Sequence, residues 1–437
     1  MFCNYFSRSQ GVTEVTSPPA RRLVTVSTMV VEQPVFNPFD PDFAANPYPH
    51  YAQLRALDPV HETPIGLWML FAYDDVSHVL RDPSLSVEER NATVPEVMVN
   101  PEREALVGDR GRNNMSMLGL DPPDHHRLRR LVAKVFTPRI VEDLRPRVQS
   151  LFDELIEDAR QRGDEIDVIS DVAFPLPFSV ISEMLGMPDG QDRLRLRAWS
   201  GAMVKTLDPI VNDEEFAEAL TSSNAMMEYL LDVIEWKRAN PGEDLLTALL
   251  AAEDAGDRLT VEELIDQVAL LFIAGHETTV NLIGNGLLAL LRNRAQMELL
   301  AGDPSLDANA VDELLRYDSP VQNSRRITLT DIELGGRTIP ARSFVLTSLA
   351  SANRDANHFG PTADDLDLTR SNAPSHVAFG GGVHHCLGAA LARLEGQVAL
   401  GNLVRRYPNM ELTGEPLVWN GRLVLRGLTK LPVALGS

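Results

Sequence analysis

Hydrophobic side chains recur at the three- and four-residue spacing of an α-helix through most of the middle of the chain. The stretch RIVEDLRPRVQSLFDELIEDARQRG predicts one helix over Arg139–Gly163 that stops at its glycine. A second predicted helix begins near Glu214 and ends at Asn240-Pro241-Gly242. Short apolar runs predict strands at Leu67–Tyr73, Arg325–Thr330 and Ser343–Ala350. The pattern therefore predicts one large, mainly helical domain with a small β portion.

The longest helical pattern covers Thr260–Leu291, roughly 45–50 Å at 1.5 Å per residue. Thr260 followed by Glu263 is a capping box, and Val268–Ala274 is apolar on every face, which predicts a buried helix. Gly275–Thr279 then interrupts it with a glycine, a carboxylate and two threonines, all unfavourable in a buried helix. A helix that approaches the surface, or a salt bridge at Glu277, would also accommodate these residues, so the pattern alone leaves their role open.

Composition excludes several classes of protein. The chain has 437 residues, 44% of them hydrophobic, and a formal net charge of −22, which argues against a general nucleic-acid or anionic-membrane binder. No apolar run reaches the roughly 18 residues of a membrane-spanning helix, so we expect a soluble protein with no membrane anchor. The two cysteines, Cys3 and Cys386, provide no disulfide framework, and a reducing cytoplasm fits. We expect residues 1–35 to form an N-terminal tail and residues 36–437 a single domain.

The stretch VAFGGGVHHCLGAALA places Cys386 behind three glycines and just before a predicted helix. The positive end of the helix dipole and nearby backbone amides favour a thiolate there. A thiolate could be a nucleophile with His384 or His385 as base, a zinc ligand or an iron ligand. No acid follows to complete a nucleophilic set, and one cysteine with two adjacent histidines is a poor tetrahedral site. A buried structural cysteine remains possible but does not explain the glycines.

The segment FGGGVHHCLG resembles the haem-binding signature of the cytochrome P-450 family, F-G-x-G-x-H-x-C-x-G, at Phe379, Gly380, Gly382, His384, Cys386 and Gly388. Further segments resemble the same family in the same order, from about Pro38 to Leu431. They are DPPDHHRLRRLV, AGHETT, ELLR, RRITLTD, DLDLTR and LRGLTKLPV. The soluble bacterial type is the most similar.

This resemblance implies the cytochrome P-450 fold and one haem b (iron protoporphyrin IX). Cys386 is then the iron ligand, and the haem propionates are held by His125, Arg129, Arg326 and His384. His385 and Arg325 are expected to be exposed neighbours. The resemblance also implies a buried charged network, formed by Glu313, Arg316 and Arg370. A thiolate ligand donates electron density to iron and favours O–O cleavage.

On the opposite side of the haem, the resemblance assigns catalytic roles to Glu277 and Thr278. Gly275 and Thr278 would let the long helix open locally, the Thr278 hydroxyl would hold dioxygen, and Glu277 would relay protons. The expected reaction is hydroxylation or epoxidation of a hydrophobic organic substrate by one atom of dioxygen. Its pocket is expected to be lined by residues 90–120, 271–274, 319–323 and 424–428.

The resemblance further implies electrons from NAD(P)H through a separate ferredoxin reductase and ferredoxin, and a monomeric enzyme. Arg127, Arg129, Arg130, Lys134 and Arg393 would form a basic patch for an acidic ferredoxin. Two alternatives stay open: a peroxide-driven peroxygenase, and a haem-binding sensor or carrier without turnover. The Glu277–Thr278 pair favours the monooxygenase over both.

Overall fold

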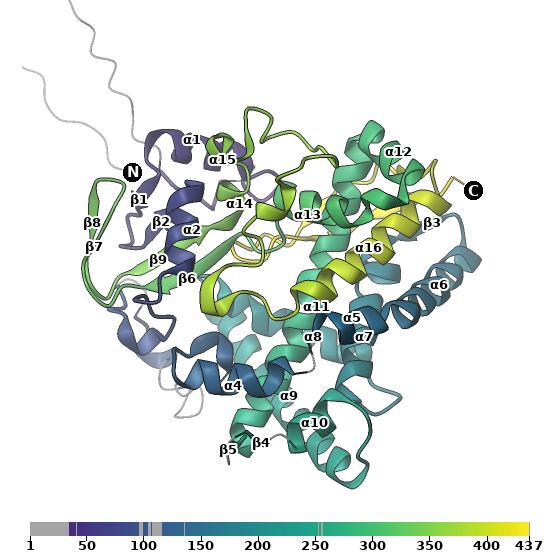
Figure 1. The fold of residues 1–437 in the computed structure, drawn as a ribbon, viewed down its shortest axis with the longest axis horizontal. Helices are drawn as coiled ribbons and strands as arrows, with labels where there is room; N and C mark the ends of the chain where they lie inside the picture. Colours follow the sequence, from purple (N-terminus) through teal and green to yellow (C-terminus); the bar gives the residue numbers. More distant parts are fainter. Residues whose placement is uncertain are drawn as a thin grey trace, which may run out of the picture. The chain divides into compact units, whose positions relative to one another are not determined.

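The computed structural model describes residues 35–436 apart from 41, 96–98, 104–105, 107–115, 135, 252 and 255–256. Helices dominate these residues, and the strands are short (Figure 1), which confirms the predicted fold class. The helices are α1 (Tyr48–Leu57), α2 (Tyr73–Arg81), α4 (Asp124–Ala133), α5 (Pro138–Asp143), α6 (Arg145–Arg162), α7 (Pro175–Leu185), α8 (Arg193–Met203), α9 (Asp213–Ala239), α10 (Leu245–Ala251), α11 (Val261–Arg292), α12 (Arg294–Gly302), α13 (Asp307–Tyr317), α14 (Leu349–Ala352), α15 (Ala356–Phe359) and α16 (Ala389–Arg406). The strands are β1 (Val60–Glu62), β2 (Trp68–Leu70), β3 (Glu165–Asp167), β4 (Glu253–Asp254), β5 (Asp257–Arg258), β6 (Asn323–Ile327), β7 (Ile332–Leu334), β8 (Arg337–Ile339), β9 (Phe344–Ser348), β10 (Glu411–Leu412), β11 (Val418–Trp419), β12 (Leu428–Lys430) and β13 (Pro432–Ala434).

Helix α11 is the central element of the helical part. The predicted capping box is present, because the Thr260 hydroxyl accepts from the Glu263 amide while the Glu263 carboxylate accepts from the Thr260 amide. The helix contacts α7, α9, α13 and α16, and Figure 1 shows α16 crossing it. A large apolar cluster surrounds it. Burial by helices on several sides explains why Val268–Ala274 shows no polar face.

The four-stranded sheet has the order β1-β2-β9-β6, with β2 and β9 parallel and the other neighbours antiparallel. Every residue of β9 is buried. Val345 packs in an apolar cluster with residues of α2, whereas Phe344 and Leu346 pack in another with residues of α1. Because successive side chains of a strand point to opposite faces, α1 and α2 cover opposite faces of this sheet.

The structure differs from the sequence prediction at several element ends. The single helix predicted over Arg139–Gly163 is two helices, α5 and α6, which meet at Leu144. Pro146 lies in the first turn of α6, where its missing N–H is tolerated, but in the interior of one long helix its ring would clash with the preceding turn. The observed strands are also shorter than predicted. The strand predicted over Ser343–Ala350 is β9, which ends at Ser348 because α14 begins at Leu349.

All described elements belong to one compact unit, Pro34–Ser437. The predicted tail, residues 1–35, lies outside the described residues except for Val35. Among the helices that the structure describes, none combines the length and the apolar character needed to cross a bilayer.

Candidate active site

Cys386 lies just before α16 on the loop of residues 376–388, which we call the cysteine loop and which contains several glycines. Gly380 and Gly382 have φ of 69° and 64°, a left-handed conformation that side chains with a Cβ disfavour. A Cβ at Gly382 would also lie 2.6 Å from the carbonyl oxygen of Leu80 in α2. The Cys386 amide donates to the Phe379 carbonyl over 2.9 Å. The glycines therefore let the loop fold back against α2 and hold the cysteine at its end, which a buried structural cysteine would not require.

Cys386 is exposed, and desolvation by the nearby protein raises the pKa of its thiol above the usual value. A hydrogen bond from the Gly388 amide and the charges of Arg129 and Arg393 act in the opposite direction. The Gly388 amide lies at the start of α16, so the predicted helix-terminus contribution is present, and desolvation opposes it. A bound metal deprotonates a coordinating thiol outright, so iron would supply what the protein alone does not.

Four nitrogen-bearing side chains gather beside this loop. His125 of α4 and His384 of the loop have ring centroids 4.3 Å apart. Arg129, one turn after His125, donates to the His385 carbonyl over 2.7 Å. Arg326 of β6 is buried and donates to the Leu80 carbonyl over 3.1 Å. The structure thus brings together the four residues that the sequence analysis assigned to the propionates, from three separate elements.

Asp121 is a nearby negative charge for His125 and Arg326, but its carboxylate accepts its hydrogen bonds from Ser86 and the Val87 amide. Both ring nitrogens of His125 are buried and have no hydrogen-bond partner among the described residues. Burial, followed by the charge of Arg129, lowers the pKa of His125 to about 4. Burial and the neighbouring charges of His125 and Arg326 lower the pKa of His384 to about 3. Carboxylates placed here would satisfy the orphaned nitrogens and neutralise the arginines, so the residues fit a haem with its propionates.

His385 and Arg325, the sequence neighbours of His384 and Arg326, are exposed, as expected. His385 is exposed and contributes its carbonyl, rather than its ring, to the bond from Arg129. The Arg325 side chain is 40% exposed and pairs with Glu89 over 2.8 Å. Neither side chain joins the buried group.

The middle of α11 does not open, contrary to the expectation from Gly275 and Thr278. The helix continues through both residues, and the Thr278 hydroxyl donates to the Ala274 carbonyl over 3.0 Å. Gly275 has a packing role instead, because a Cβ there would lie 2.8 Å from Cγ1 of Ile181 in α7. Ala274 is exposed and Thr278 half-buried within an otherwise buried helix, so one face of α11 is left uncovered by protein at this point.

Glu277 lies on the same turn and has a neighbour that the sequence analysis did not consider. Its side chain is 19% exposed, and a carboxylate oxygen lies 3.6 Å from Nε2 of the buried His276. Nδ1 of His276 lies 2.7 Å from the Phe272 carbonyl, which can only accept, so Nδ1 carries the proton and Nε2 faces the carboxylate side. Glu277 is therefore neither fully solvated nor neutralised by a buried arginine.

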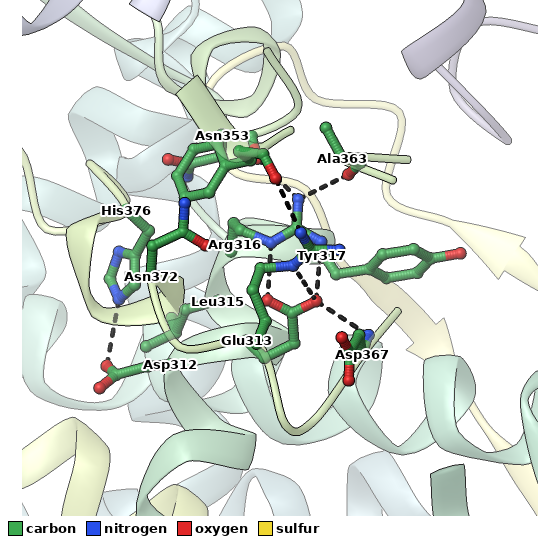
Figure 2. Close-up of polar contacts among 12 residues, drawn as sticks. Asp312, Glu313, Leu315, Arg316, Tyr317, Asn353, Ala363, Asp367, Asn372 and His376 are labelled. Atoms are coloured by element: carbon green, nitrogen blue, oxygen red, sulfur yellow. Dashed lines mark hydrogen bonds and ion pairs between the residues drawn. The ribbon is translucent and has the colours of Figure 1, made fainter. Parts of the chain in front are cut away.

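Glu313 and Arg316 of α13 form a fully buried ion pair (Figure 2). Two hydrogen bonds of 2.6 and 2.7 Å join them, and Arg370 reaches the same carboxylate over 3.2 Å. Arg316 also donates to backbone carbonyls of residues 353, 363 and 365. This arrangement differs from an ordinary surface pair at i, i+3, because three separate chain segments depend on it.

Sequence reasoning missed two buried acidic residues. Asp312 precedes Glu313 and binds His376 and Arg393 on the opposite side of α13. Glu395 of α16 is fully buried, and neither of its carboxyl oxygens has a well-formed hydrogen bond within the described part of the chain. Burial raises its pKa to about 8, with partial compensation by the Thr279 hydroxyl. A charged residue within an apolar helical run was the available signal for Glu395.

The basic patch is smaller than the sequence suggested. Arg127 forms an ion pair with the buried Glu263, and Arg393 is bound to Asp312 over 2.7 Å. Their charges are therefore largely neutralised within the fold. The exposed members on the surface of α4 and its C-terminal end are Arg130 and Lys134.

Comparison with known proteins identifies the family. The family model described as Cytochrome P450 matches residues 53–302 and 304–419. The chain is 44% identical over 416 residues to Cytochrome P450 107B1 of Saccharopolyspora erythraea, covering 93% of this chain and 99% of that one. It is 43% identical over 405 residues to the Vitamin D(3) 25-hydroxylase of Pseudonocardia autotrophica, covering 91% and 96%.

A solved structure gives the same result for the fold. The crystal structure of P450BioI in complex with hexadec-9Z-enoic acid ligated acyl carrier protein matches with a TM-score of 0.82 at 34% identity. The match covers 90% of this chain and 99% of that one. The chain therefore belongs to the cytochrome P450 family, and it is a haem-dependent monooxygenase, an oxidoreductase.

Proposed function

We propose that Cys386 would ligate the iron of a haem b, and that His125, Arg129, Arg326 and His384 would hold its propionates. The observation that carries this assignment is the gathering of His125, whose buried ring nitrogens have no hydrogen-bond partner among the described residues, with His384, Arg129 and Arg326 beside the cysteine loop. The bound thiolate–haem supplies the oxygen-activating chemistry. The protein's part is to hold the thiolate, neutralise two carboxylates and deliver protons.

The proton-delivery role falls to Thr278 and Glu277. The Thr278 side chain lies on the face of α11 that other parts of the protein leave uncovered. If its hydroxyl rotated, the hydrogen bond to the Ala274 carbonyl would be replaced by one to a reacting oxygen. Glu277 is partly exposed, so it can take a proton from solvent and return it toward the threonine.

The substrate that we propose is a large hydrophobic organic molecule, hydroxylated or epoxidised at one carbon. Named relatives support this class: one is a vitamin D(3) hydroxylase, and another was solved with a fatty acid on a carrier protein. In the expected lining segment 319–323, Ser319 donates a hydrogen bond to the Leu315 carbonyl and Asn323 donates one to the Leu423 carbonyl. These donors are therefore already used within the protein. The pocket specificity therefore rests more on the other segments, of which residues 90–120 lie partly outside the described residues.

We further propose that electrons come from NAD(P)H through a reductase and a small acidic ferredoxin, in the cytoplasm, with the enzyme as a monomer. Arg130 and Lys134 are exposed and cationic on a strongly acidic chain, which favours steering of an acidic partner to α4. Reversing both charges to glutamate should slow first-electron transfer and flatten its salt dependence, since screening acts over about 10 Å at 0.1 M salt. Unchanged rate and salt slope in stopped-flow reduction would place the docking site elsewhere.

The ligand assignment is tested by absorption spectroscopy. Reduced wild-type protein with carbon monoxide should show the red-shifted Soret band of a thiolate complex. Cys386→Ala should lose this band, and the control Cys3→Ala should keep it. A normal band in Cys386→Ala would refute the assignment. Turnover with peroxide alone, and none with electron donors, would favour a peroxygenase, and the absence of turnover with either would favour a carrier.

A further inference from the structure

Asp312 of α13 contacts residues on both sides of Cys386 in the chain: Arg393 of α16 and His376 at the start of the cysteine loop. The carboxylate lies on α13 and is 8% exposed as a residue. Its Oδ1 accepts from Nε of Arg393 in α16 over 2.7 Å and lies 3.2 Å from Nε2 of His376, at the start of the loop. Nδ1 of His376 accepts from the Ala378 amide over 3.1 Å, so Nε2 carries the proton and donates to Asp312. One carboxylate oxygen thus receives two donors from different parts of the chain.

Both partners of Asp312 pack on Phe379, the first residue of the haem-binding signature. The guanidinium carbon of Arg393 lies 4.6 Å from the Phe379 ring centroid, and the His376 ring lies 5.5 Å from it. The Phe379 carbonyl in turn accepts from the Cys386 amide. A continuous set of contacts therefore leads from Asp312 through one aromatic ring to the backbone that holds the cysteine.

Figure 2 shows that the contact between Asp312 and His376 is separate from the buried ion pair of Glu313 and Arg316. Asp312 and His376 face each other on one side of α13, whereas Glu313 and Arg316 lie on the other. Although burial alone would raise the pKa of Asp312, the bonds from His376 and Arg393 hold it below its usual range. The carboxylate is therefore charged at neutral pH, and it balances Arg393, whose side chain is 30% exposed and is one of the cations near the thiol.

We infer that Asp312 is a positioning residue for the cysteine ligand: through His376 and Arg393 it fixes Phe379, and so the donor geometry of Cys386. The inference rests on the proposed ligation by Cys386. Without the carboxylate, the half-exposed Arg393 would turn to solvent, the ring would lose one of its two supports, and the loop would open more often. Loss of the negative charge that balances Arg393, a cation near the Cys386 thiol, would also favour the reduced, less positive state of a haem held there.

The test compares Asp312→Asn with Asp307→Asn in haem-loaded protein. Asp307 is a matched control, because it joins the same two helices through two 2.8 Å bonds to Arg405 but forms no hydrogen bond or ion pair with the described residues of the loop. The measurements are the reduction potential, titrated with a chemical reductant, and the rate at which the thiolate–carbonyl Soret band converts to its blue-shifted form. For Asp312→Asn we expect a more positive potential and a conversion about tenfold faster, the effect of losing one charged hydrogen bond. Asp307→Asn should match wild type in both.

Arg393→Lys separates the support of the Phe379 ring from the effect of the positive charge. This test does not depend on whether an Asp312 variant folds. It keeps the cation but loses the planar group that stacks on Phe379, so conversion should accelerate while the potential stays near that of wild type. Equal potentials and conversion rates in Asp312→Asn and Asp307→Asn, or a wild-type conversion rate in Arg393→Lys, would overturn the inference. Failure of the ligand assignment itself would be distinct, because wild-type protein would then lack the red-shifted band.

Discussion

Replacing Glu395 with glutamine should change how the stability of the protein depends on pH. The carboxyl is fully buried on α16, and burial raises its pKa from an ordinary 4.5 to about 8. A raised folded-state pKa means that the group binds its proton more tightly when folded. Its stabilising contribution is therefore fully present below pH 4.5 and is lost as the pH rises toward 8. A neutral glutamine of similar shape has no such dependence.

The size of the effect follows from the two pKa values. At 1.36 kcal/mol per pKa unit, the interval between 4.5 and about 8 corresponds to about 5 kcal/mol. The free energy of unfolding of Glu395→Gln relative to wild type should thus be constant below pH 4.5. It should rise by about 3 kcal/mol between pH 4.5 and pH 7 and level off above pH 8. The change across pH carries the argument, because any constant effect of the amide on packing cancels.

Urea unfolding of equally haem-loaded proteins, followed by circular dichroism across this pH range, measures the difference. Glu228→Gln, an exposed position on α9, serves as the control for simple loss of a carboxylate. Infrared spectroscopy gives an independent reading, since wild type at pH 6 should show a protonated-carboxyl band that Glu395→Gln lacks. Parallel stability profiles for wild type and Glu395→Gln, or no such band, would refute the reasoning.

Three further changes test other parts of the structure. Glu313→Gln should lower the free energy of unfolding by about 3–5 kcal/mol and yield little haem-loaded protein, because it strands the buried Arg316; a loss below about 1 kcal/mol in denaturant titration would contradict this. Thr278→Ala should retain haem and substrate spectra but divert reducing equivalents to peroxide, and wild-type coupling of NAD(P)H use to product would count against the proposed role. Gly275→Val should cost about 1–3 kcal/mol through its clash with Ile181, with partial recovery on adding Ile181→Ala; equal melting temperatures of wild type and Gly275→Val would exclude that clash.

The sequence predicted the elements whose signals are local. The capping box at Thr260 predicted the start of α11, and the glycines before Cys386 indicated a loop, in which the structure gives Gly380 and Gly382 a left-handed conformation. The break between α5 and α6 was missed because the apolar spacing continues across it, while the cause is the single residue Pro146. The supposed opening of α11 was wrong for a related reason: Gly275 accommodates Ile181, a neighbour about ninety residues earlier that no local pattern shows.

The site residues show the same division. Cys386 and its glycines could be found from spacing alone, and the resemblance supplied the arginines and histidines. Arg127 and Arg393 looked like surplus surface charge, because a cation on a polar helix face gives no sign of a buried acid opposite to it. Asp312 and Glu395 were overlooked for the converse reason, since their roles depend on desolvation and on partners from other elements.

Asn353 connects the buried ion pair to the cysteine loop, and this connection gives the network a role beyond stability. Its carbonyl accepts from Arg316 over 2.8 Å, and its side-chain oxygen accepts from the Val377 amide over 2.7 Å. The Gly380 amide in turn donates to the Val377 carbonyl over 2.8 Å. If Glu313 is removed, the buried Arg316 guanidinium loses its counter-charge and is expected to move toward other acceptors or solvent. Such a movement would disturb its hydrogen bond to the Asn353 carbonyl. The first consequence of weakening the network should therefore be a disturbed start of the cysteine loop, so that haem is released before the helices unfold.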